Sequence, residues 1–191
     1  MSKILIATLA ALLLSACASA PRITMQGNEV PMVQKRHDAK PGQFEKFTYP
    51  LKSGKDLPSR ALRAVITAEK LRSSPEWRST IVFCAETKAS GASTCLSIAA
   101  TADGTAFAPT VVEQAEKLAQ VFNTPVPFTI SATGSHKLDM VFHDGSFNMM
   151  VDDKVILTRK LRSAPDQFWF SCSSVVCAVD VYHPLPGATM Q

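Results

Sequence analysis

Histidine, aspartate and serine are the residue types that many hydrolases use for nucleophilic catalysis, and two short stretches of this chain contain them. His143-Asp144-Gly145-Ser146 holds all three types. Neighbours on one tight turn, however, cannot form the hydrogen-bonded relay of a catalytic triad. Gly134-Ser135-His136 is typical of a loop. The chain also lacks the sequence motifs of serine esterases, zinc proteases and nucleotide-binding proteins. We therefore predict that the protein is not an enzyme and binds no cofactor.

The four histidines do not have the spacing of a metal site. His136 and His143 would lie on opposite faces of one predicted strand, about 23 Å apart along it. A site that joins His143, Asp144 and His183 requires separate strands to meet, and His37 lies far upstream. We expect no bound metal.

The N-terminal segment has the three parts of an export signal, and it ends in a cysteine. Lys3 is the positive region and Ile4 to Leu14 is the apolar run. This run is too short to cross a bilayer, which takes about 20 apolar residues. Leu14-Ser15-Ala16-Cys17 resembles the lipobox of bacterial lipoproteins. The alternative is an ordinary secretory signal, cut after one of three nearby alanines: Ala16, Ala18 or Ala20.

The lipobox resemblance implies a lipid anchor and an address in the cell envelope. Residues 1–16 would be a signal peptide that is removed, and Cys17 would carry a diacylglycerol and usually an amide-linked acyl chain such as palmitate. Two or three acyl chains make membrane attachment effectively permanent. The residue after Cys17 is Ala18. In many bacteria an aspartate at this position retains a lipoprotein at the inner membrane. The resemblance therefore favours the outer membrane, with the body facing the periplasm.

Charge is distributed unevenly along the chain, which has 20 Lys and Arg against 16 Asp and Glu and a net charge of +4. Residues 22–72 hold eleven basic and five acidic groups, and residues 73–191 hold eight and eleven. Solubility explains this balance, and attraction of the basic part to anionic lipids or cell wall is the alternative. The basic groups are not interleaved with stacking aromatic residues, so we do not expect nucleic acid as a partner.

Four cysteines remain beside Cys17, and an even number in an exported chain indicates two disulfides. Pairing Cys84 with Cys95 sets Phe83 against Leu96 on the other face of a hairpin. Pairing Cys172 with Cys177 in a second hairpin sets Phe170 against Val179 and Phe168 against Val181. That register puts Trp169 on the outer face, opposite Asp180. There Trp169 is either covered by a helix or part of a contact surface.

Hydrophobic periodicity predicts an α+β body after a flexible tether. Residues 17–43 are mixed polar with several prolines and form the predicted tether, and residues 44–191 form one domain. Apolar residues at three-and-four spacing predict helices over 57–71 and 110–122. Asp144-Gly145 predicts a type I′ hairpin turn. About seven antiparallel strands are expected, and nine segments are candidates for them: 44–51, 79–86, 94–100, 127–132, 137–143, 146–151, 154–161, 166–171 and 176–182.

Part of the sequence resembles the invasion-associated locus B family of α-proteobacterial envelope proteins. The similarity rests on Met150-Val151-Asp152-Asp153, on Phe168-Trp169-Phe170-Ser171-Cys172 and on Cys177-Ala178-Val179, after a Trp-led strand from Trp77 to Cys84. The resemblance implies a disulfide-stapled, β-rich envelope domain that is not an enzyme. In some members it is linked to host-cell interaction.

These features together predict a lipid-anchored periplasmic binding or scaffold module. Its partners would be the membrane, through the anchor, and another envelope protein or a cell-wall component. A surface adhesion or invasion protein is the second hypothesis. An enzyme that acts on envelope polymers is the third, and it requires carboxylates or histidines that meet in a cleft.

Overall fold

Side chains that alternate between buried and exposed positions dominate this chain, and the alternation produces strands throughout. The computed structural model describes residues 31–50, 59–88, 90–114, 121–143, 145–161 and 163–182. These residues form thirteen strands and no helix. The predicted α+β class is therefore wrong, and the protein is an all-β sandwich. Within the described residues no helix is present that could span a membrane.

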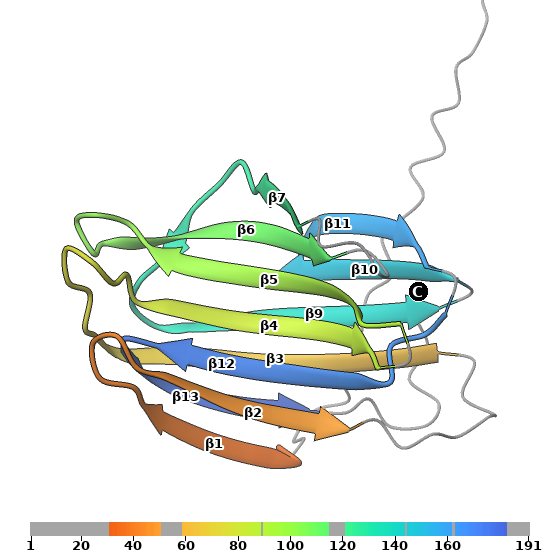
Figure 1. The fold of residues 1–191 in the computed structure, drawn as a ribbon, viewed down its shortest axis with the longest axis horizontal. Helices are drawn as coiled ribbons and strands as arrows, with labels where there is room; N and C mark the ends of the chain where they lie inside the picture. The colour runs from red at the N-terminus through yellow and green to blue at the C-terminus, as the bar shows by residue number, and fades with distance from the viewer. Residues whose placement is uncertain are drawn as a thin grey trace, which may run out of the picture.

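Two antiparallel sheets face each other across one core (Figure 1). The six-stranded sheet runs in the order β1 (Val33–Asp38), β13 (Val175–Tyr182), β3 (Ser59–Leu71), β9 (Ser135–His143), β10 (Ser146–Val151) and β11 (Lys154–Lys160). The seven-stranded sheet runs in the order β2 (Phe44–Pro50), β12 (Gln167–Ser173), β4 (Thr80–Thr87), β5 (Ala92–Ala100), β6 (Ala106–Gln114) and β7 (Val121–Pro125), with β8 (Ile130–Ser131) paired to β6.

Aromatic rings from neighbouring strands fill the centre of the core. The ring of Phe83 on β4 stacks on that of Phe170 on β12, with centroids 4.4 Å apart, and lies 5.8 Å from that of Phe168. All three side chains are fully buried. Burying a side chain of this size contributes about 1.5–3 kcal/mol each. The core therefore depends on the register of β12 against β4.

The first predicted helix is in fact the long strand β3. Leu62, Ala64 and Ile66 point into the core, whereas Arg63 and Val65 lie on the outer face and are half-buried. Because apolar residues occupy both faces, their spacing also satisfies a helical period. Pairing with β13 on one side and β9 on the other decides the outcome. The start of the predicted helix, at residues 57 and 58, lies outside the described residues.

The second predicted helix covers strand residues at both of its ends. Val111 of β6 is buried and pairs with Leu96 of β5. Phe122 belongs to β7 and pairs with Glu113 of β6. Residues 115–120 lie outside the described part of the chain. The β-branched residues Val111 and Val112 favour a strand, and the edge of β5 offers this segment a partner.

Several strand predictions are confirmed, and β1 was missed in addition to the strands predicted as helices. The hairpin β9–β10 has the predicted register, with Met149 opposite Met140 and Val151 opposite Leu138. Asp144 of its turn is outside the described residues. Strand β1 was not predicted, because it falls within the range assigned to the tether. Its polar side chains hide a regular pairing with β13, from Val33 to Asp38.

Both predicted disulfides are present. One lies within a sheet and the other joins the two sheets. Cys84 and Cys95 lie directly opposite each other on β4 and β5, in the predicted hairpin register. Cys172 and Cys177 are bonded across the two sheets, because β12 belongs to one sheet and β13 to the other. The predicted hairpin between these two strands is therefore wrong. Ser174, the single residue between them, has φ 52°, and the chain changes sheet there.

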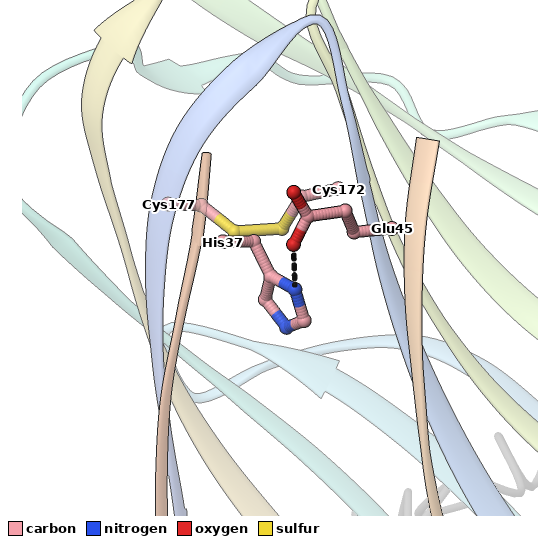
Figure 2. The surroundings of a disulfide bond; sticks show 4 residues. All are labelled: His37, Glu45, Cys172 and Cys177. Carbon is pink, nitrogen blue, oxygen red and sulfur yellow. Dashed lines mark hydrogen bonds and ion pairs between the residues drawn. A yellow bond between two sulfur atoms is a disulfide. The ribbon is translucent and has the colours of Figure 1, made fainter. Parts of the chain in front are cut away.

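A hydrogen bond between His37 and Glu45 joins the sheets beside this disulfide (Figure 2). His37 on β1 lies opposite Cys177, and Glu45 on β2 lies opposite Cys172. His37 Nδ1 is 3.0 Å from Glu45 Oε2. The two sheets are thus joined twice along this side, which we call the closed edge. On the other side β7 and β11 end their sheets without a described partner strand, and we call this the open edge.

The two disulfides should contribute similar stability, although only one joins the sheets. Cys84→Ala with Cys95→Ala, and separately Cys172→Ala with Cys177→Ala, should each lower the free energy of unfolding by about 2–3 kcal/mol, because each bond closes a short loop in the unfolded chain. Urea unfolding followed by fluorescence measures this change. A loss below about 0.5 kcal/mol in either variant would contradict the prediction.

Candidate functional site

Three loops meet at one end of the sandwich and are tied together through Ser174. They are residues 39–43 between β1 and β2, residues 72–79 between β3 and β4, and Ser174 itself. The Ser174 N–H donates to the carbonyl of Gln43 at 3.1 Å, and its hydroxyl accepts from the N–H of Gly42 at 3.0 Å. We call this region the serine corner.

Ser79 fixes the loop between β3 and β4 to the same point. Its fully buried hydroxyl donates to the carbonyl of Ser174 at 2.5 Å and accepts from the N–H of Arg72 at 2.9 Å. The N–H of Ser79 donates to the hydroxyl of Ser73 at 2.9 Å. An ion pair between Arg72 and Asp38 holds the loop to the end of β1. Buried hydrogen bonds of this kind keep a loop in one conformation.

Two large aromatic side chains are exposed at the serine corner. Trp77 is 52% exposed, and Phe44, two residues after Gly42, is 60% exposed. The Trp77 backbone is held by Ser74, whose N–H donates to the Trp77 carbonyl at 2.7 Å. Gly42 has φ +73°, and a methyl group placed on it would lie 3.3 Å from Trp77 Nε1. The indole therefore packs on the Gly42 backbone, and a side chain there would displace it.

A third aromatic side chain lies on the outer face of the seven-stranded sheet, farther along β12. Trp169, the predicted interaction residue, pairs with Cys84 on one side and Thr48 on the other. It is half-buried, and no helix among the described residues covers it. Instead the ammonium of Lys46 lies 4.2 Å from its ring centroid, a cation–π contact. Its role as an interaction residue stays a prediction.

At the other end of the strands a cleft opens between the sheets near the open edge. Its volume is about 610 Å³. An ion pair between Glu113 on β6 and Arg159 on β11 joins its two walls. We call this feature the end cleft.

The described histidines do not come together in one site. His136 on β9 is buried and has two partners, Asp152 Oδ2 at 2.8 Å from Nδ1 and the Ser131 carbonyl at 2.8 Å from Nε2. His143 lies at the other end of β9, and His183 is outside the described range. The described residues contain no group of three side chains that could hold a metal ion.

Sequence reasoning singled out Trp169 and the cysteines but missed Trp77 and Phe44. Both lie beside turn residues, in Pro41-Gly42 and Pro75-Glu76. An aromatic residue next to a turn is exposed more often than one inside an apolar strand, and this was the available signal.

Comparison with known proteins identifies the fold and no family. No family model matches the chain, and no curated protein matches it. A tetrameric galectin from the ball sponge Cinachyrella sp. is similar in structure, with a TM-score of 0.50, 8% identity, and coverage of 73% of this chain and 99% of that one.

Two further solved structures are similar at lower scores. The CBM2 module of the evolved Dit of Lactobacillus casei BL23 phage J-1 has a TM-score of 0.49 and 9% identity, covering 79% of this chain and 76% of that one. An alginate lyase from Pseudomonas aeruginosa has a TM-score of 0.48 and 12% identity, covering 65% and 64%. These likenesses concern the β-sandwich alone.

The turn between β5 and β6 lies at the same end as the serine corner and contains an acidic group with a shifted pKa. The carboxylate of Asp103 accepts hydrogen bonds from the Thr101 hydroxyl at 2.5 Å and the Thr105 hydroxyl at 2.7 Å. These bonds, with one from the Thr105 N–H, lower the pKa of Asp103 from 3.8 to about 2.

This lowered pKa makes the turn sensitive to acid in a defined range. The stabilisation by the Asp103 carboxylate should be present above about pH 4 and should be lost as the pH falls through about 2. A titration of the Asp103 carboxyl carbon by NMR checks the value. Asp103→Asn should remove this acid-dependent change from the turn signals of Thr101 and Thr105. A midpoint near 4 would contradict the prediction.

Proposed function

We propose that this chain is a lipid-anchored glycan-binding module of the bacterial cell envelope, and that it binds its ligand at the serine corner. The observation that carries the proposal is the exposure of Trp77 and Phe44 on loops held by hydrogen bonds. Aromatic rings grouped with polar groups are typical of the residues that line ligand sites. A rigid backbone reduces the entropy that binding would cost.

A sugar ring fits the chemistry of this corner. Pyranose rings present a face of C–H groups that packs on an aromatic ring, and hydroxyls around the rim that bond to polar groups. At the corner the polar groups are the serine-rich loop 72–79 and the backbone around Gly42. This combination of one apolar face and a polar rim is the composition of a small-molecule site.

The exposed area favours a small ligand over a flat protein partner. An aromatic side chain presents about 150–250 Å², so the exposed halves of Trp77 and Phe44 offer roughly 200 Å² together. A standard protein interface buries about 800 Å² per partner. One or two sugar rings match the smaller area.

The direction of β1 supports an anchored module that reaches outward. The chain enters the sheet at Val33, where the N–H of Met32 donates to the Val181 carbonyl at 2.8 Å. Strand β1 then runs to Asp38 and delivers the chain to the serine corner. An anchor on Cys17 would therefore pull at the end of β1 that is remote from Trp77. An outer-membrane lipoprotein that faces the periplasm would meet the cell-wall glycan. This glycan is therefore the polymer that the serine corner would bind.

The anchor is tested directly on the exported protein. Mass spectrometry of the mature N-terminus should find Cys17 with a diacylglycerol and an amide-linked acyl chain, and Cys17→Ser should move the protein from the membrane pellet to the soluble fraction. An unmodified mature terminus would contradict the anchor and would leave the binding site untouched.

The binding site is tested with purified peptidoglycan sacculi and their soluble muropeptides. Trp77→Ala should weaken binding about tenfold or more, because it removes the larger of the two exposed rings. Phe44→Ala should weaken it by a smaller factor. Binding is measured by co-sedimentation with sacculi and by fluorescence titration with muropeptides.

Trp169→Phe is the matched control, since Trp77 and Trp169 are the two tryptophans of the chain. This variant should bind normally, and all of its tryptophan fluorescence comes from Trp77. Quenching or a blue shift on addition of muropeptides would then report contact at the serine corner. Unchanged binding by Trp77→Ala would contradict the proposed site.

A further inference from the structure

The end cleft has the dimensions of a ligand site, and it is separate from the serine corner. Its volume of about 610 Å³ falls in the range of about 300–1,000 Å³ that ligand pockets occupy. One wall comes from the last residues of β4, the first of β5 and the ends of β6 and β7. The other wall comes from β11 and the residues after it.

An ion pair between the walls places both charges in the cleft. The Glu113 side chain is only 14% exposed, whereas that of Arg159 is 53% exposed. Their bond joins one guanidinium nitrogen to one carboxylate oxygen. A guanidinium has five N–H donors, so Arg159 retains capacity to bind a second acceptor. Lys160 also lines the cleft, but it alternates along β11 with Arg159 and with Leu161, which packs against the core, so its ammonium points to the opposite face.

The rest of the lining combines an apolar ring with hydroxyl and amide groups. Phe122 of β7 is 51% exposed and pairs directly with Glu113 of the neighbouring strand β6. Ser93, Thr94 and Gln114 provide hydroxyl and amide groups from β5 and β6. A ligand held here would meet an aromatic face, neutral polar groups and a cationic side chain in one space.

We propose that the end cleft binds an acidic saccharide, a pyranose that carries a carboxylate. The carboxylate pairs with Arg159, the C–H face of the ring packs on Phe122, and the hydroxyls bond to Glu113 and to Thr94, which pairs with Glu113. Arginine and carboxylate form strong hydrogen bonds because both are charged. The site lies at the opposite end of the strands from Trp77, so it would add a second subsite to the module.

The charge balance selects a carboxylate over a phosphate. A phosphate monoester carries close to two negative charges near neutral pH, and it would bring them next to the Glu113 carboxylate. A carboxylate carries one, and the five N–H donors of Arg159 can serve it together with Glu113. Hydroxyl groups on the ligand can donate to the Glu113 carboxylate, of which Arg159 contacts one oxygen.

The experiment is an NMR titration of the full exported chain with sodium D-glucuronate, D-glucose and D-glucose 6-phosphate. Glucuronate should give saturable shifts at the backbone amides of Ser93, Glu113 and Arg159. D-glucose should bind at least about tenfold more weakly than glucuronate, because it cannot form the charged hydrogen bonds. Arg159→Gln should weaken glucuronate binding by about the same factor.

Arg36→Gln is the matched control, since Arg36 also pairs with a glutamate, Glu69, on the six-stranded sheet away from the cleft. It should bind glucuronate normally. Equal binding of glucose and glucuronate, tighter binding of glucose 6-phosphate, or no shifts at the cleft amides would each overturn the proposal. Loss of binding in Trp77→Ala but not in Arg159→Gln would also overturn it, and would assign the sugar to the serine corner instead.

Discussion

The closed edge of the sandwich is the constraint on which the rest of the structure depends. At Ser174 the chain leaves one sheet and enters the other within a single residue, which requires a positive φ in a residue other than glycine. Such a conformation costs of order 1 kcal/mol and persists only where the surroundings determine it. Here the surroundings are the Cys172–Cys177 bond and the hydrogen bonds of Ser174 to Gln43 and Gly42.

This constraint also explains why His37 and Glu45 occur where they do. The disulfide fixes β12 and β13 at a set separation, and β1 and β2 continue each sheet outward from them. Two side chains opposite the cysteines must then meet across the gap, as Figure 2 shows. His37 is 7% exposed, and its Nε2 atom has no partner among the described residues. A half-satisfied polar group inside a sandwich is unfavourable in itself, and the covalent bond beside it joins the same two sheets.

The sequence contained enough information for local pairing and too little for the layering. The Cys84–Cys95 and β9–β10 registers follow from alternation and turn residues, because each involves neighbours in the chain. The helix over 57–71 was wrongly predicted because the apolar residues on both faces of β3 fit either period. Whether β12 and β13 share a sheet depends on the distant strands β2, β4, β1 and β3, which local patterns do not reveal. The serine corner was missed for the same reason, since its three loops are far apart in sequence.

The direction of β1 has a mechanical consequence if the module is held at one end and bound at the other. A pull between residue 32 and the serine corner runs along β1, parallel to the axis of its neighbour β13. Six residue pairs, from Val33–Val181 to Asp38–Val176, connect the two strands. Force in this direction loads their hydrogen bonds together in shear, whereas a perpendicular force would open them one after another. The edge strand would therefore resist tension as a unit.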